Sequence, residues 1–205
     1  MLTIESLREK ALGTVDVTAG GSSFTIDPDQ LESLGLPASS LAVGACLDDA
    51  AAALLALAAE AHEAERRGLA LLARAEQSAF MLKVKLESRG FSARAVALAL
   101  ERLASERWLD DSRFARAYAS SRLARRPEGP ASLAAALRAR GIDGETAAAA
   151  LRELLDPETR KTALARAWER EFKRKGGDVS ETRSALRRLG FTGSEISSWL
   201  EERDS

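Results

Sequence analysis

Cysteine and histidine, which build most metal centres and many catalytic centres, are nearly absent from this sequence. The 205 residues include one cysteine, Cys46, and one histidine, His62. A single cysteine excludes an internal disulfide framework and a cysteine-based zinc site. His62 has no second histidine and no cysteine near it, so we expect a surface residue and not a metal ligand. The sequence predicts neither a bound metal nor a cofactor.

Signatures of catalysis are also missing. The Gly20-Gly21 pair lacks the Lys-Ser/Thr sequence that completes a phosphate-binding loop, and the chain has no Gly-x-Ser-x-Gly nucleophile elbow. Asp110 and Asp111 are adjacent carboxylates, but adjacent aspartates at the start of a helix usually cap it. We therefore expect a protein that is not an enzyme and that acts by binding.

Long apolar runs and aromatic residues are scarce. The run Ala50–Ala59 is too short to span a membrane, and no signal peptide is recognisable, so we expect a cytoplasmic protein without a membrane segment. Aromatic residues make up 5% of the chain, whereas alanine, leucine, arginine and glutamate are abundant. This composition favours helix and predicts a mainly all-α fold.

One short stretch predicts how the helices are connected. Gly90 suits the left-handed position after a helix, and Phe91 can fold back onto Leu86 one turn earlier, as in a Schellman motif. Ser92 can cap the next helix, in which Val96 lies opposite Phe91 as a hydrophobic staple. A single phenylalanine is therefore expected to tie two helices together.

The same spacing occurs three times, which indicates a repeat. It recurs in Leu137, Gly141, Ile142, Asp143 and Ala147, and in Leu186, Gly190, Phe191, Thr192 and Ile196. Twelve residues before each glycine stands a residue suited to an N-cap, namely Ser78, Gly129 or Asp178. The period near fifty residues predicts three tandem three-helix units, over residues 63–108, 109–155 and 156–205.

Residues 1–62 have a different character. Thr14–Val17 and Phe24–Ile26 alternate with a period of two around Gly20-Gly21, which predicts a β-hairpin. The segment before the hairpin, Leu2–Leu12, fits a strand or a helix. A short helix is expected from Asp27 to Leu34, and a long apolar helix from about Leu47 to Glu63 is expected to support the hairpin.

The formal net charge of −1 hides strong local imbalances. Residues 1–63 carry ten acids against Arg8 and Lys10. Residues 112–140 carry seven arginines against Glu128 alone, and residues 160–190 carry ten bases against four acids. An acidic head followed by two basic bands points to a polyanion or an acidic protein face as partner.

The basic bands supply the candidate binding residues. These are Arg113, Arg116, Arg122, Arg125, Arg126, Arg138, Arg140, Lys173, Arg174 and Lys175. An arginine-bearing helix face is often only solvated, but the near-absence of acids from 112 to 140 favours binding there. Arg138 and Arg140 also suit a helix end, and Lys173–Lys175 fit a contact loop or an ordinary helix C-terminus equally well. Tyr118 fits core packing better than a stacking platform for single-stranded nucleic acid.

Three motifs stand out: the run from Leu109 to Ala115 (Leu-Asp-Asp-Ser-Arg-Phe-Ala), Gly129-Pro130, and Arg140-Gly141-Ile142. Together they resemble the signature of the RecX family, regulators of the RecA recombinase. The N-terminal hairpin is similar to that of the longer members, so the resemblance covers essentially the whole chain. Met81 and Ala136 stand where many members have a glutamate, which affects surface pairing and not the fold.

The resemblance implies a fold and a function. It implies an elongated, curved stack of three-helix repeats that lies in the groove of the RecA nucleoprotein filament and inhibits ATP hydrolysis and strand exchange. The expected partner is therefore the RecA filament, with single- and double-stranded DNA as further partners of some members, and the protein is expected to be a monomer in DNA repair and the SOS response. The alternative is a helical repeat protein that binds nucleic acid without sequence specificity.

Overall fold

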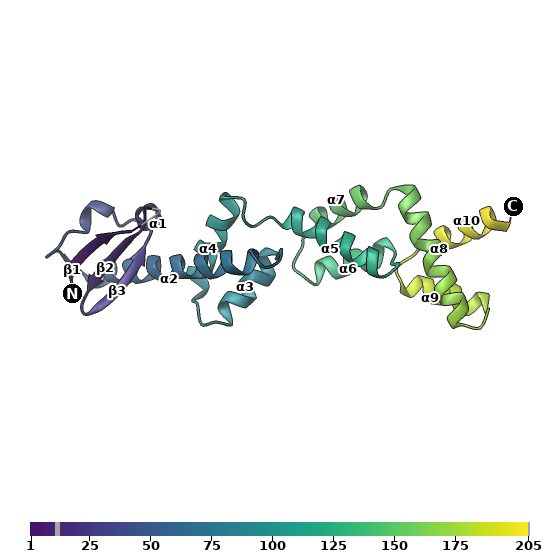
Figure 1. Cartoon of the computed structure of the whole chain (residues 1–205), viewed down its shortest axis with the longest axis horizontal. Coiled ribbons are helices and arrows are strands. Elements are labelled where there is room, and N and C mark those ends of the chain that lie inside the picture. Colours follow the sequence, from purple (N-terminus) through teal and green to yellow (C-terminus); the bar gives the residue numbers. More distant parts are fainter. Residues whose placement is uncertain (11–12, 205) are drawn as a thin grey trace. The chain divides into compact units, whose positions relative to one another are not determined.

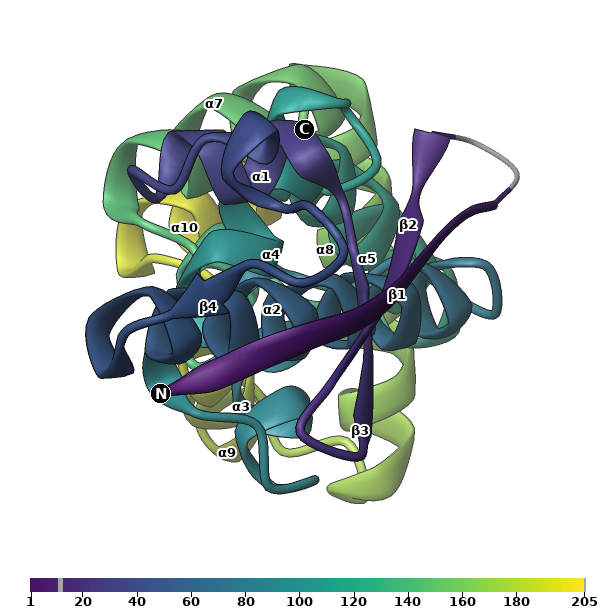
Figure 2. The same ribbon diagram turned by 90° about the vertical axis from the view of Figure 1, so that its left-hand side faces the viewer.

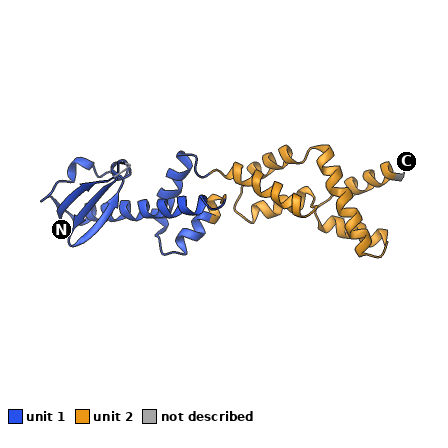
Figure 3. Cartoon of the chain, in the orientation of Figure 1, with its two compact units in different colours: residues 1–75, 82–109 blue, residues 76–81, 110–205 orange. Residues whose placement is uncertain are grey.

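The computed structural model describes residues 1–10 and 13–204 (Figure 1). The chain forms two compact units, which are shown in different colours in Figure 3. Unit 1 comprises Met1–Ala75 and Leu82–Leu109, and unit 2 comprises Glu76–Met81 and Asp110–Ser205. The predicted class is confirmed: the chain is mainly helical, with three-helix repeats and a small N-terminal sheet. None of the helices in the described part of the chain has the length and apolar character needed to cross a membrane.

A four-stranded antiparallel sheet forms the head of unit 1. Its strands are β1 (Leu2–Glu9), β2 (Val15–Ala19), β3 (Ser22–Ile26) and β4 (Cys46–Leu47). Their order in the sheet is β3-β2-β1-β4. The β2–β3 pair is the predicted hairpin, and both glycines of its turn, Gly20 and Gly21, have positive φ. The first segment, which fitted a strand or a helix, is the strand β1; Ala11 and Leu12 of that segment lie outside the described residues.

Helices complete unit 1, and the longest of them, α2 (Asp49–Leu72), packs against the sheet. The others are α1 (Pro28–Ser33), the short 3-10 helix η2 (Ala38–Ser40), α3 (Ala79–Glu87) and α4 (Ala93–Ser105). Figure 2 looks onto the head and shows β1, β2 and β3 in front of α2. The buried side chains of Ile4, Val17, Ile26, Leu31 and Leu55 form the core between the sheet and helices α1 and α2.

The long helix of unit 1 differs from the expectation. The prediction that this helix ends at Glu63 and that a separate three-helix unit begins at residue 63 was wrong in its boundary, because α2 is one helix of 24 residues that runs to Leu72. Leu47 belongs to β4, and Asp48 caps α2 by accepting a hydrogen bond from the Ala51 amide at 2.7 Å. Gly68 lies within the helix and leaves room for α4, since a Cβ there would lie 2.7 Å from a Leu103 methyl. The division at 62/63 thus falls inside α2, and the four-part division of the chain stays a prediction.

Arg102 joins the head to the first repeat within unit 1. Its guanidinium lies 2.5 Å from the carboxylate of Asp27, which caps α1, and 3.5 Å from Glu65 of α2. His62 of α2 is half-buried and not the surface residue that we expected, and burial is the main cause that lowers its pKa. The head is therefore anchored through a charged cluster that the sequence pattern did not indicate.

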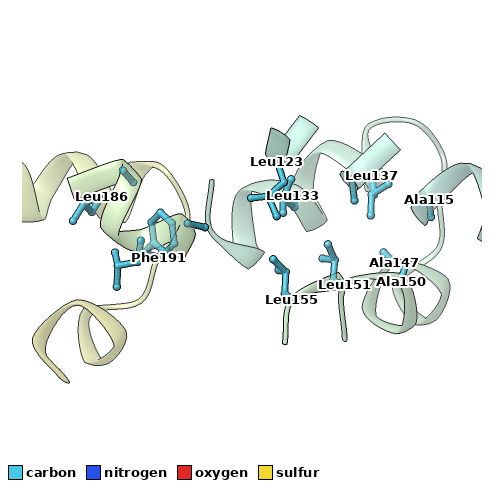
Figure 4. Packing of buried hydrophobic residues seen from close by; sticks show 14 of the residues in the cluster. Ala115, Leu123, Leu133, Leu137, Ala147, Ala150, Leu151, Leu155, Leu186 and Phe191 are labelled. Atoms are coloured by element: carbon cyan, nitrogen blue, oxygen red, sulfur yellow. The ribbon is translucent and has the colours of Figure 1, made fainter. Parts of the chain in front are cut away.

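Unit 2 contains the second and third repeats. Its helices after α3 are α5 (Asp111–Arg125), α6 (Pro130–Arg138), α7 (Gly144–Leu154), α8 (Pro157–Arg174), α9 (Val179–Arg188) and α10 (Gly193–Asp204). One hydrophobic cluster runs through both repeats. Figure 4 shows Leu123, Leu133 and Leu137 facing Leu151 and Leu155 across the second repeat.

The three predicted turns have the expected backbone geometry. Gly90, Gly141 and Gly190 have φ values of +92°, +79° and +89°. In the second and third repeats the amide after the glycine donates to the carbonyl five residues earlier, at 3.2 Å in both cases, as in a Schellman motif. Each turn is followed by a side-chain cap, from Ser92, Asp143 or Thr192. The predicted positive φ and following cap are therefore confirmed at all three turns, whereas among the described residues the Schellman hydrogen bond forms at Gly141 and Gly190 and not at Gly90.

The turns also hold the repeats together. The Gly129 amide at the start of α6 donates to the Leu189 carbonyl at 2.7 Å, and the Ala131 amide donates to the Gly190 carbonyl at 3.3 Å. A helix N-terminus thus satisfies the open carbonyls at the end of a helix in the next repeat. Gly129 is required by this approach, because a Cβ there would lie 2.3 Å from the carbonyl group of Gly190.

A similar contact lies earlier in the chain, between the start of α3 and the second repeat. The Ser78 hydroxyl donates to the Arg140 carbonyl at 2.6 Å, and a Cβ on Gly141 would lie 2.2 Å from Phe80. We expected the aspartate pair 110–111 to cap the same helix, but only Asp110 caps α5. Asp111 instead accepts a hydrogen bond from the Ala79 amide at 2.8 Å and so caps α3. The second repeat therefore supplies both a carbonyl and a carboxylate to the start of α3.

We predict that Gly129→Ala lowers the free energy of unfolding of unit 2 by about 1 to 3 kcal/mol, because the added methyl overlaps the turn at Gly190. Thermal and urea denaturation followed by circular dichroism measure the effect. Gly144→Ala is the matched control, since a Cβ there meets no atom within 4 Å. Equal stability of Gly129→Ala and the wild-type protein would contradict the proposed contact between the repeats.

Candidate functional site

The first helices of the second and third repeats, α5 and α8, carry a basic surface. Two hollows of about 500 and 470 Å³ share Arg125. Among the residues that line the first are Glu76, Tyr118, Arg122, Arg125, Arg126 and Arg140. The second is lined by Arg125, Pro127, Arg166, Glu169, Arg170 and Lys173. We call the two hollows together the basic groove.

A buried carboxylate holds two of the groove arginines. Glu128 has 1% of its side chain exposed, and its carboxylate accepts a hydrogen bond from Arg122 Nε at 2.9 Å. The Ser132 hydroxyl donates to the same oxygen at 2.7 Å, and Arg126 Nε forms an ion pair with the other oxygen at 3.1 Å. Burial alone would raise the pKa of Glu128, but the hydrogen bonds and the positive charges outweigh it and lower the pKa. The carboxylate is therefore charged and orients both guanidinium groups.

Glu171 does the same in the third repeat. It is buried on α8, with Arg170 Nε at 3.2 Å from one oxygen and Arg174 Nε at 2.8 Å from the other. Burial opposes ionisation here too, but the hydrogen bonds from Arg174 and Arg170 lower the pKa of Glu171 overall. Each arginine has five N–H donors, so binding to one carboxylate leaves others available to a ligand.

Tyr118 is packed and not free to stack on a base. The Arg140 guanidinium lies 4.1 Å from the centre of its ring, and the ring of Phe114 is stacked 5.7 Å away. Its hydroxyl accepts a hydrogen bond from Arg122 at 3.0 Å. Tyr118 therefore positions arginines, and the reading of this residue as a stacking platform for single-stranded nucleic acid loses support.

Among the described residues, three cations of the groove lack both a carboxylate and any other side-chain contact of the kind that holds Arg140 over Tyr118. In the part of the chain that the structure describes, Arg125, Arg166 and Lys173 form neither an ion pair nor a side-chain hydrogen bond, and all three are exposed. They lie together in the second hollow, where Arg125 comes from α5 and Arg166 and Lys173 come from α8. These three are the cations most available to an anionic partner.

The other predicted residues are neutralised or lie elsewhere. Arg113 pairs with Glu76 at 2.6 Å, Arg116 with Glu153 at 3.7 Å, and Lys175 with Glu181 at 2.8 Å. The low count of acids from 112 to 140 was misleading, since Glu76 and Glu153 come from outside that stretch. Arg138 is not in the basic groove, although Arg140 is, because the chain turns between them at the end of α6.

Sequence reasoning missed Arg166, Arg170 and the two buried glutamates. A signal existed for Arg166, because Phe114–Tyr118 and Leu164–Trp168 match at an offset of fifty residues, which pairs Arg116 with Arg166. No comparable signal marks Glu128 or Glu171, whose burial depends on the tertiary packing. The described residues contain no group of three or more histidine, cysteine, aspartate or glutamate side chains placed to hold a metal ion. The groove is suited to binding anions.

Comparisons with known proteins point to one family. The family model "RecX, second three-helix domain" matches residues 110–151, the stretch that contains α5 and α6 and most of α7. The regulatory protein RecX of Treponema pallidum (strain Nichols) is 37% identical over 139 residues, which are 68% of this chain and 84% of that protein. The regulatory protein RecX of Xanthomonas campestris pv. campestris (strain B100) is 37% identical over 136 residues, which are 64% of this chain and 82% of that protein.

Solved structures show the same fold. A crystal structure of regulatory protein RecX matches with a TM-score of 0.76 at 20% identity and covers 100% of both chains. The crystal structure of RecX from Lactobacillus salivarius matches with a TM-score of 0.64 at 19% identity, over 71% of this chain and 97% of that one. Since the identities are low, these two structures support the architecture alone.

We predict that Glu128→Gln lowers the free energy of unfolding by about 1 to 3 kcal/mol at pH 7, because Arg122 and Arg126 lose a buried negative charge. The pKa of Glu128 is lower in the folded protein than in the unfolded chain. The ionised carboxylate therefore stabilises the fold fully at a pH above the ordinary glutamate pKa. This contribution is lost as the pH falls through the pKa of the folded state. The difference between the wild type and the variant should therefore shrink as the pH falls from about 7 to about 3. Urea denaturation across this range measures it.

The exposed Glu101 offers a control, since Glu101→Gln removes a charge without removing a buried ion pair. A Glu128→Gln effect that stays constant across the pH range would contradict a role for the ionised carboxylate.

Proposed function

The chain belongs to the RecX family, and on that premise we propose that it binds the RecA nucleoprotein filament and inhibits the ATPase, recombinase and strand-exchange activities of RecA. It acts as a regulator in DNA repair and the SOS response, works in the cytoplasm as a monomer and catalyses no reaction itself. The family supports the choice of partner, and the basic groove supports the choice of surface.

The single observation that carries the assignment is the arrangement of cations across two repeats. Glu128 and Glu171 fix two arginines each, and Arg125, Arg166 and Lys173 line the hollow shared by the two repeats without a carboxylate of their own. A fixed guanidinium loses less conformational entropy when it binds than a free one does. The groove is therefore prepared for acidic side chains or for phosphates at the surface of a nucleoprotein filament.

Inhibition then follows from occupancy. A filament presents the same protomer many times, so two repeats that share one groove can bind neighbouring protomers at once. Binding at two points raises the affinity for the filament above that for a free RecA monomer, because the second contact is intramolecular. A protein held in this way blocks the entry of a second duplex and restricts the movements that accompany ATP hydrolysis.

The alternative is a protein that binds nucleic acid alone, without sequence specificity. The free cations favour it, since Arg125, Arg166 and Lys173 can each contact a phosphate. The packed ring of Tyr118 disfavours it for single strands, because the groove then lacks an aromatic platform. The two functions differ in one measurable respect: binding to bare DNA is steeply salt-dependent and needs no RecA.

We predict that the triple variant Arg125→Ala, Arg166→Ala and Lys173→Ala needs about a tenfold higher concentration to halve the ATPase rate of RecA on single-stranded DNA. The reason is the loss of the three cations that have no internal partner. Circular dichroism should be unchanged, because all three side chains are exposed.

A triple variant at Arg74, Arg94 and Arg187 removes the same charge from exposed positions outside the groove and is the control. Wild-type inhibition by the groove variant would show that the groove is not the binding surface. Equal loss in both triple variants would show that net charge alone determines the effect.

A further inference from the structure

Arg138 lies at a third hollow of unit 2, separate from the two hollows of the basic groove. This hollow of about 450 Å³ lies where α6, α7 and the start of α8 meet, and it has no lining residue in common with the groove. Its floor includes Pro130, Ala134, Ala147, Leu151 and Leu155. Its rim carries Arg138, Arg152 and Arg160. We call it the apolar hollow.

The floor of the apolar hollow is the edge of the hydrophobic core. Leu151 and Leu155 belong to the core cluster of unit 2, and each is 7% exposed. The exposed side chain of Ala148 also lines the hollow and leaves room above these leucines. An apolar side chain that entered the hollow would therefore contact the core directly and remove apolar surface from water.

The rim carries uncompensated positive charge. Arg160 pairs with Glu195, but Arg138 and Arg152 are exposed and form no ion pair or side-chain hydrogen bond within residues 1–10 and 13–204. The phosphates of a nucleic acid would pair with these cations, but a nucleic acid would not bury the apolar floor. A neutral apolar ligand would use the floor and leave the cations unpaired.

We propose that the apolar hollow binds an acidic, apolar segment of a protein partner. The segment inserts a leucine-like side chain above Leu151 and Leu155, and carboxylates on either side of it pair with Arg138 and Arg152. This inference does not depend on the proposed function, because it concerns another face of unit 2 and other residues. It gives the chain a second contact surface of different chemistry from the basic groove.

The test uses the full chain with ¹³C-labelled alanine methyl groups and a synthetic helical peptide. The peptide has about 14 residues, with leucines at helical spacing among aspartate and glutamate. We expect it to shift the methyl resonances of Ala134, Ala147 and Ala148, and not that of Ala117, which lines the basic groove. A peptide with serine in place of leucine, and one with lysine in place of the acids, should both bind at least about tenfold more weakly.

Two variants separate the floor from the rim. Arg138→Glu with Arg152→Glu should weaken the acidic peptide about tenfold or more and strengthen the lysine peptide, whereas Arg94→Glu with Arg187→Glu should change neither. Ala148→Leu should block the hollow without removing a charge, and it should fold normally because Ala148 is exposed.

Several results would overturn the proposal. They are the absence of any methyl shift, shifts at Ala117 alone, equal binding of the serine peptide, and unchanged affinity in the double charge reversal. A concentration-dependent shift of the same methyls without peptide, together with a dimer in analytical ultracentrifugation, would assign the hollow to a second copy of this chain instead.

Discussion

The close approach of Gly129 to the turn at Gly190 is the contact on which unit 2 depends. The backbone hydrogen bonds there join the start of α6 to the end of α9 and leave no space for a side chain at Gly129. Because α6 packs with α5 and α7, and α9 packs with α8, this contact fixes one repeat against the other. The shared hollow that contains Arg125, Arg166 and Lys173 exists only in that arrangement.

The buried glutamates contribute more to the groove than to the net stability. Exposed ion pairs contribute only about 0 to 1 kcal/mol, and Arg122 and Arg126 are 29% and 56% exposed. Burying the carboxylate of Glu128 has a desolvation cost, which its hydrogen bonds offset. The main effect of the two glutamates is to orient the side chains of four arginines. The glutamates are buried, so a ligand does not reach them, whereas N–H groups of the arginines remain available.

The features that the sequence predicted correctly depend on residues that are close together in the chain. The three glycine turns, their caps and the hairpin follow from residues within a few positions of each other, and the structure has them as expected. The sequence did not predict that α2 is continuous: the helix expected to end at Glu63 runs on to Leu72, and Gly68 lies inside it close to Leu103 of α4. Nor could it predict which acids meet which arginines, since Glu76 and Glu153 reach Arg113 and Arg116 from distant positions. The candidate groove was therefore only partly visible: Arg122, Arg125 and Arg126 were identified, whereas Arg138 lies elsewhere and Arg166 was missed.

The central claim is that the basic groove acts on a RecA filament and not on DNA alone. The most direct test titrates the wild-type protein into RecA that hydrolyses ATP on single-stranded DNA, and measures binding to the same DNA without RecA in parallel. The account predicts that the ATPase rate falls at concentrations well below those that coat the bare DNA. Inhibition that begins only when the DNA itself is saturated would contradict it and would assign the groove to nucleic-acid binding.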